Sequence, residues 1–188
     1  MTALTDTALL IMDVQVGVVA NIAPAAEVPG RLAPAADAAR AAGIQLIYVV
    51  GRFAPGHPEI GERSAEVFRN LKASGAFTDD DPNTAVHPAL TVAPGDLVVP
   101  KKRYGGFSGS SLGTALRANG ITSLVLSGVV TSGAVLSTVT AAFDLDYAVT
   151  VLEDGCADYD PEVHRVLTEK VFPRRATVRS IADWTASL

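Results

Sequence analysis

The sequence predicts an α/β fold built on a parallel sheet. Short runs rich in Val, Ile and Leu alternate with helical patterns along the chain. Several of these runs are apolar throughout, as expected for strands that helices cover on both faces. We expect strands at Ala8–Asp13, Gln45–Gly51, Asp96–Pro100, Ser123–Gly128, Ala148–Leu152 and Thr177–Ser180.

Helical patterns lie between these strands. One ends just before Gly43, a residue type that commonly follows a helix C-terminus. The last one starts well, with Asp160 as an N-cap and Pro161 at the first helical position. We expect helices at Leu32–Ala42, Ser110–Ala118, Gly133–Leu145 and Pro161–Val171.

Composition indicates one domain, residues 1–188, that handles a small molecule. The chain is 48% hydrophobic and 19% charged, with a net charge of −5 and no basic stripe, which argues against nucleic acid as a partner. Its one cysteine, Cys156, allows no internal disulfide and fits a reducing, cytoplasmic setting. We find no signal peptide and no apolar stretch of about 18 residues, so we expect no membrane partner.

The connection from Phe53 to Pro94 is long and rich in proline, with one short helical patch at Glu62–Ala73. Long connections on a rigid scaffold often carry binding residues. We consider two interpretations equally: a lid or pocket wall, or a plain excursion over the surface.

Two opposite charges follow apolar strands. Asp13 ends the first strand, and Lys101 follows the third. Either residue alone is more often structural, and the run Lys101-Lys102-Arg103 is more often a solvated turn. Together they indicate a site, because open α/β sheets bind ligands outside the carboxyl ends of their strands.

A third segment, Gly128 to Thr138, passes abruptly from strand to helix through small residues. Such a turn suits a nucleophile or a pocket of backbone amides. It carries the hydroxyls of Thr131 and Ser132, but it lacks the Gly-x-Ser-x-Gly spacing, and no histidine evidently pairs with Ser132. Serine nucleophilic catalysis is therefore not expected.

Together these segments resemble the isochorismatase-like hydrolase family, also called the cysteine hydrolase family. The resemblance is carried, in order, by Asp13-Val14-Gln15, by Lys101, Tyr104 and Phe107, by Gly128, Val129, Thr131 and Val135, and by Glu153–Asp158. It implies a three-layer Rossmann-like fold, with a six-stranded parallel sheet and helices on both faces. It further implies a homodimer or larger homo-oligomer and a non-proline cis peptide in the Val129–Thr131 turn.

The resemblance also implies the site. Asp13, Lys101 and Ala134 take the catalytic positions, with Ala134 where the family has its cysteine. The implied substrate-binding residues are Gln15, Phe53, Tyr104, Phe107, Val130 and Thr131. The aromatic members of this set would suit a flat or cyclic substrate.

Ala134 determines which chemistry remains. In the family's amidases the cysteine attacks a carbonyl carbon, the aspartate takes the thiol proton and the lysine supports the pair. Ala134 cannot attack, and Cys156 follows a different strand, so thiol amidase chemistry is not expected. Isochorismatases carry glycine at this position and use the aspartate as an acid, which here would require a raised pKa for Asp13.

Three interpretations remain open. The chain is a hydrolase in which Asp13 and Lys101 perform acid–base chemistry, or a catalytically silent member that binds a small ligand or a partner in the same pocket. The third is that Ala134 replaces an original cysteine by engineering, although the neighbouring residues favour a natural alanine. We expect no cofactor and no metal, because His57 and Glu59 lack a second nearby histidine. His164 is expected to have a packing or surface role.

Overall fold

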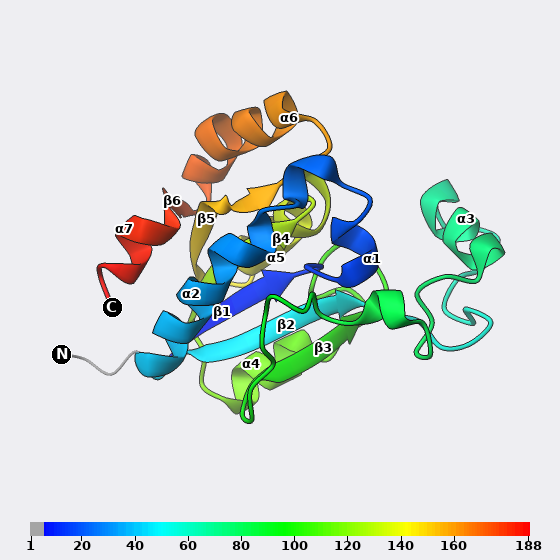
Figure 1. Ribbon diagram of the computed structural model, residues 1–188, viewed down its shortest axis with the longest axis horizontal. Helices are drawn as coiled ribbons and strands as arrows, with labels where there is room; N and C mark the ends of the chain where they lie inside the picture. The colour runs from blue at the N-terminus through cyan, green and yellow to red at the C-terminus, as the bar shows by residue number, and fades with distance from the viewer. Residues whose placement is uncertain (1–5) are drawn as a thin grey trace.

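The computed structural model describes residues 6–188. Its sheet has six parallel strands in the order β3-β2-β1-β4-β5-β6, with helices on both faces (Figure 1). The α/β class and the three-layer arrangement predicted from sequence are confirmed. The strands are β1 (Thr7–Met12), β2 (Gln45–Gly51), β3 (Leu97–Lys101), β4 (Ser123–Val129), β5 (Ala148–Ala157) and β6 (Thr177–Arg179).

Seven α-helices connect or flank these strands, and within residues 6–188 none is long and apolar enough to cross a bilayer. They are α1 (Val16–Val19), α2 (Val28–Ala41), α3 (Glu66–Ser74), α4 (Leu112–Ala118), α5 (Leu136–Asp144), α6 (Pro161–Val166) and α7 (Ile181–Thr185). π-helical turns precede α5 (Thr131–Val135) and follow α6 (Leu167–Val171). Single 3₁₀ turns lie at Ala23–Ala25, Pro82–Thr84 and Phe172–Arg174.

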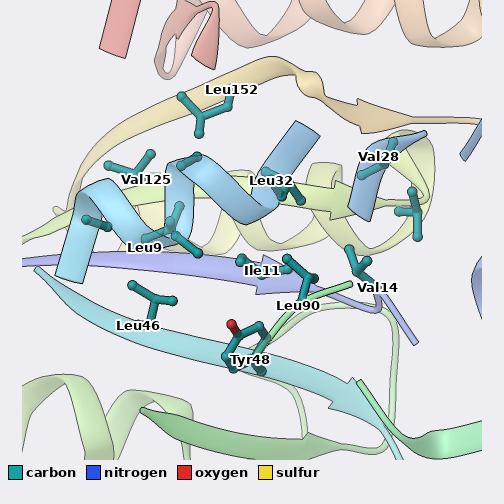
Figure 2. Packing of buried hydrophobic residues seen from close by; sticks show 14 of the residues in the cluster. Leu9, Ile11, Val14, Val28, Leu32, Leu46, Tyr48, Leu90, Val125 and Leu152 are labelled. Carbon is teal, nitrogen blue, oxygen red and sulfur yellow. The ribbon is translucent and has the colours of Figure 1, made fainter. Parts of the chain in front are cut away.

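Alternate residues of each central strand face opposite cores. On one face, α2 lays Val28 and Leu32 over Leu9 and Ile11 of β1, and Trp184 of α7 joins the same cluster (Figure 2). The other face carries the apolar sides of α4 and α5, which pack on the remaining residues of β1, β2 and β4. All six residues of β1 are buried, which explains its uninterrupted apolar sequence.

The predicted strands agree with the structure to within one residue at most ends, with one clear exception. β5 continues through Glu153 and Asp154 to Ala157, five residues beyond the predicted Leu152. A shift in its register with β4 allows Gly128 to pair with Cys156, so the extension adds pairing at the carboxyl end of the sheet. The predicted first helix also begins earlier, at Val28, with Pro29 in its first turn.

β1 and β4 approach each other very closely at their carboxyl ends. Gly128 has φ +126°, and a Cβ placed on it would lie 2.1 Å from the carbonyl oxygen of Met12. Only glycine fits this contact. The contact lies between the two strands where the sheet order reverses, which is the position of the binding crevice in doubly wound sheets.

The long connection between β2 and β3 lies on this same side. Its helix α3 projects beyond the strand ends (green, at the right of Figure 1), and none of its residues is buried. Phe53 lies just after β2, and its N–H donates to the Phe77 carbonyl at 2.9 Å. This bond ties the segment after α3 back to the end of β2. The connection is therefore placed to form one wall of a site at the carboxyl edge.

We predict that Gly128→Ala destabilises the protein by at least about 3 kcal/mol, because the new methyl group meets the β1 backbone at a φ that favours glycine. Urea denaturation followed by circular dichroism measures the change. Gly30→Ala is the matched control, since Gly30 lies in α2 with open space around it. That control should be neutral or slightly stabilising. Equal stability of the two variants would contradict the close contact.

Candidate active site

Asp13 and Lys101 form an ion pair at the carboxyl edge of the sheet. The Lys101 Nζ lies 2.7 Å from Asp13 Oδ2, and the two side chains are 4% and 14% exposed, respectively. Asp13 follows β1 in the left-handed region, at φ +53°, and its N–H donates to the Val49 carbonyl of β2. Lys101 is the last residue of β3, so the pair spans the end of β2, where Gly51 contributes no side chain.

Burial raises the pKa of Asp13 above its ordinary value, and this effect outweighs the charge and hydrogen bond of Lys101, which lower it. The other carboxylate oxygen, Oδ1, is buried and has no hydrogen-bond partner among the described residues. A carboxylate with an unsatisfied oxygen binds a proton more readily than a fully solvated one. Asp13 is therefore suited to exchange protons with a ligand.

Gln15 holds the loop after β1 in place. Its side chain is fully buried, and its amide nitrogen donates to the carbonyls of Gly51 (3.0 Å) and Thr84 (2.7 Å). Its amide oxygen accepts from Gly51 N–H at 2.8 Å. These bonds use the amide inside the protein, and Gln15 does not line the cavity that contains Asp13. We assign it a positioning role for the loop that carries Asp13.

Ala134 lies in the turn after β4. The Val129–Val130 peptide bond is cis, in the turn where the family resemblance implied one. The chain then forms the π-helical turn Thr131–Val135, in which Ala134 is 1% exposed. Irregular helical turns of this kind are frequent at functional sites.

Asp158 and His164, to which the sequence assigned no role at the site, fix this turn. The Ser132 N–H donates to Asp158 Oδ2 at 2.6 Å, and Thr131 Oγ1 lies 2.9 Å from His164 Nδ1. Burial lowers the pKa of His164, which favours its neutral form. Thr131, an expected substrate-binding residue, is fully buried and does not line the cavity that contains Asp13.

Asp13, Lys101 and Ala134 line one cavity of about 310 Å³. Three of the expected binding residues, Phe53, Tyr104 and Val130, also line it. Much of the remaining wall is apolar and comes from the connection between β2 and β3, namely Val67, Phe68, Leu71 and Phe77. The pocket-wall interpretation of that connection therefore agrees with the structure.

Phe107, an expected substrate-binding residue, lies outside this cavity. Its ring stacks on Tyr147 with 5.9 Å between centroids, and it packs against the core beneath α4 and α5. The chain turns at Gly105 and Gly106, and a Cβ on Gly106 would lie 3.0–3.3 Å from Leu112, Met12 and Thr138. This close packing carries the segment away from the cavity before it reaches Phe107.

Within residues 6–188, no three His, Cys, Asp or Glu side chains gather as a metal site would require. His57 is buried and its Nε2 lies 2.7 Å from the Ala76 carbonyl, while Glu59 pairs with Lys102 at 3.0 Å. Cys156 is also buried, on β5, and burial raises its pKa to about 12. None of these groups joins the cavity.

Comparison with models of protein families matches residues 7–183 of this chain to the isochorismatase domain. The chain belongs to the isochorismatase family. It is 32% identical over 175 residues to the ureidoacrylate amidohydrolase RutB of Methylobacterium radiotolerans (84% of this chain, 66% of that protein). It is 32% identical over 209 residues to RutB of Azorhizobium caulinodans (97% and 90%).

A solved structure of an isochorismatase family protein from Burkholderia thailandensis is also similar. Its TM-score is 0.86 at 30% sequence identity, covering 98% of this chain and 96% of that chain. The chain spans about two thirds of the length of the RutB proteins from Methylobacterium radiotolerans and Rhizobium rhizogenes. The isochorismatase fold is thus shared over nearly the whole of this chain.

We predict that Lys101→Met raises the pKa of Asp13 further, because it removes the charge and the hydrogen bond that lower it. Carbon-13 NMR of the Asp13 carboxyl group measures this pKa. Lys102→Met is the matched control, since Lys102 pairs with Glu59 and not with Asp13. An Asp13 pKa that is the same in both variants would contradict the pairing.

The same change has a predictable effect on stability. A pKa raised in the folded state favours folding at acidic pH, and this contribution is lost as the pH rises through the folded-state value. We therefore expect the free energy of unfolding of Lys101→Met to fall more steeply than that of the wild type between acidic and neutral pH. Urea denaturation at a series of pH values measures the slope, and parallel slopes would count against the assignment.

Proposed function

We propose that this protein hydrolyses a small molecule by acid–base chemistry of Asp13 and Lys101, without a nucleophilic side chain. The observation that carries the proposal is the buried 2.7 Å ion pair, which lines the same cavity as Ala134. Family membership supports hydrolysis of a small molecule. The amidohydrolase relatives favour a carbonyl carbon bonded to nitrogen as the point of attack.

In the proposed reaction, water replaces the thiol. Ala134 leaves room where a cysteine sulfur would otherwise stand, and Asp13 takes a proton from the attacking water. The resulting hydroxide bonds to the carbonyl carbon, and a tetrahedral intermediate forms. When the C–N bond breaks, Asp13 returns the proton to the departing nitrogen, so that an acid and an amine are released and Asp13 is restored.

The ion pair favours this base-first order over an acid-first one. Lys101 at 2.7 Å stabilises the carboxylate form of Asp13, which is the form that can accept a proton. Burial keeps its pKa above that of an ordinary aspartate, which makes it a stronger base. An acid role on a vinyl ether, as in isochorismatases, would require Asp13 to be protonated beside the Lys101 ammonium.

The second candidate is a silent member that binds a ligand in the same cavity. The absence of a nucleophile at Ala134 favours it. Against it stands the buried charge pair, because taking two charges out of water is unfavourable and a purely binding pocket does not need it. The two candidates differ in turnover: the silent one predicts none across amides, ureido acids, esters and vinyl ethers.

We predict that Asp13→Asn lowers kcat/KM by about 10²- to 10⁴-fold for any substrate found in such a screen. Asparagine keeps the shape of the side chain and still accepts a hydrogen bond from Lys101, so the circular dichroism spectrum should not change. Asp146→Asn is the control, since Asp146 also has a positive φ, +62°, and does not line the cavity. Full activity of Asp13→Asn would refute the assigned role.

We predict that Ala134→Cys gains amidase activity that iodoacetamide abolishes, because the variant restores a thiol beside Asp13. Ala142→Cys is the matched control: Ala142 is equally buried, on α5, and does not line the cavity. Steady-state assays on an amide panel measure the gain. No gain in Ala134→Cys would contradict the alignment of this turn with the family's nucleophile segment.

A further inference from the structure

We propose that Arg103 forms an anion-binding subsite in the cavity and that the substrate therefore carries a carboxylate. This inference rests on the proposed hydrolase function and specifies its substrate class. Arg103 lines the same cavity as Asp13 and Ala134. Its backbone carbonyl also accepts a hydrogen bond from Lys101 Nζ at 3.0 Å, which links the subsite directly to the proposed acid–base pair.

The charges around the cavity leave Arg103 without compensation. Lys101 is neutralised by Asp13, and the neighbouring Lys102 is neutralised by Glu59 at 3.0 Å. Within the described residues, Arg103 has no carboxylate partner. The charged side chains that line the cavity are Asp13, Lys101 and Arg103, so its wall has one net positive charge, which an anionic ligand would balance.

The guanidinium group of Arg103 is held in position before any ligand binds. Its Nη1 donates to the Lys102 carbonyl at 2.5 Å, and its Nη2 donates to the Glu59 carbonyl at 3.0 Å. The group also lies 5.0 Å from the centroid of the Phe68 ring on α3. These contacts use two of its five N–H groups, and the remaining donors can bind a carboxylate in the fork geometry that arginine favours.

The surroundings strengthen such an interaction. Phe53, Phe68 and Leu71 make much of the cavity wall apolar, and charges attract more strongly where water is excluded. A volume of about 310 Å³ corresponds to roughly ten water-sized volumes of about 30 Å³ each. A short acid of roughly ten non-hydrogen atoms fits this space, with its carboxylate at Arg103 and its scissile carbonyl at Asp13.

The first experiment measures binding without turnover. The probes are crotonate and crotyl alcohol, which share the carbon chain and differ in the charged group, and isothermal titration calorimetry compares their affinities for the wild type. We expect crotonate to bind more tightly than crotyl alcohol and to lose that advantage at high salt. Equal affinity for the two probes, or no binding of crotonate, would overturn the subsite.

Substitutions then locate the effect. We expect Arg103→Gln to bind crotonate roughly 10- to 100-fold more weakly, with little change for crotyl alcohol. Arg103→Lys should recover only part of the affinity, because lysine keeps the charge but not the fork. Arg117→Gln is the control for the same change in net charge, since Arg117 lies on α4 outside the cavity. Unchanged crotonate affinity in both Arg103 variants would overturn the proposal.

Turnover separates this inference from the proposed function. The substrates are 3-ureidopropionate and propylurea, which share the ureido group as their scissile group and differ in a carboxylate against a methyl group. The subsite predicts that Arg103→Gln raises KM for the acid, leaves its kcat nearly unchanged and barely affects propylurea. If Arg103 governs crotonate binding but the wild type hydrolyses neither compound, the subsite stands and the hydrolase proposal fails. If the wild type hydrolyses both equally well, the hydrolase stands and the subsite fails.

Discussion

The buried contact between Asp13 and Lys101 is the constraint on which the site depends. Neither charge could remain in this low-dielectric position alone, because an unpaired buried ion is destabilising by several kcal/mol. The pair therefore requires that β1 and β3 end at the same level on either side of β2. It also requires that Gly51, at the end of β2, leave the space between them open. The ion pair can therefore form only in a sheet with this strand order.

Several interactions from distant parts of the chain hold the pair and its surroundings. Gln15 ties the loop of Asp13 to Gly51 and Thr84, and Asp158 binds the turn that carries Ala134. The fit of Gly128 against Met12 brings β4 up to β1. The contacts of Gln15 and Asp158 support loops, and the contact of Gly128 joins two strands of the sheet. A rigid scaffold with loops held by buried hydrogen bonds is what a preorganised site requires.

The sequence predicted the sheet well because its strands are buried on both faces and read as apolar runs. It also placed Asp13 and Lys101 together, because charged residues directly after parallel strands meet at one edge. The extension of β5 to Ala157 was not predicted, since Glu153 and Asp154 interrupt its apolar run. That extension depends on a register shift between β5 and β4. A register shift arises from the pairing of two strands, so the sequence of β5 alone does not reveal it.

The differences at the site have a similar origin. Phe107 entered the expected binding set through the family resemblance, and the tight packing at Gly106 directs the chain away from the cavity before it reaches this residue. The contacts of Asp158 and His164 join residues 26 and 33 positions apart, and local patterns carry no information about such pairs. The sequence assigns no role to Arg103, because a run of three cations is more often a solvated turn. Its place in the cavity follows from backbone carbonyls and an aromatic ring contributed by the long connection.

Cys156, the one cysteine of the chain, lies in the sheet beneath the site, and burial raises its pKa to about 12. The thiolate is the reactive form of cysteine, and here almost none of it exists at neutral pH. Cys156 is therefore a poor target for peroxide or an alkylating agent. Chemistry at Asp13 and Lys101 needs no thiolate, so oxidation of a cysteine would not stop it.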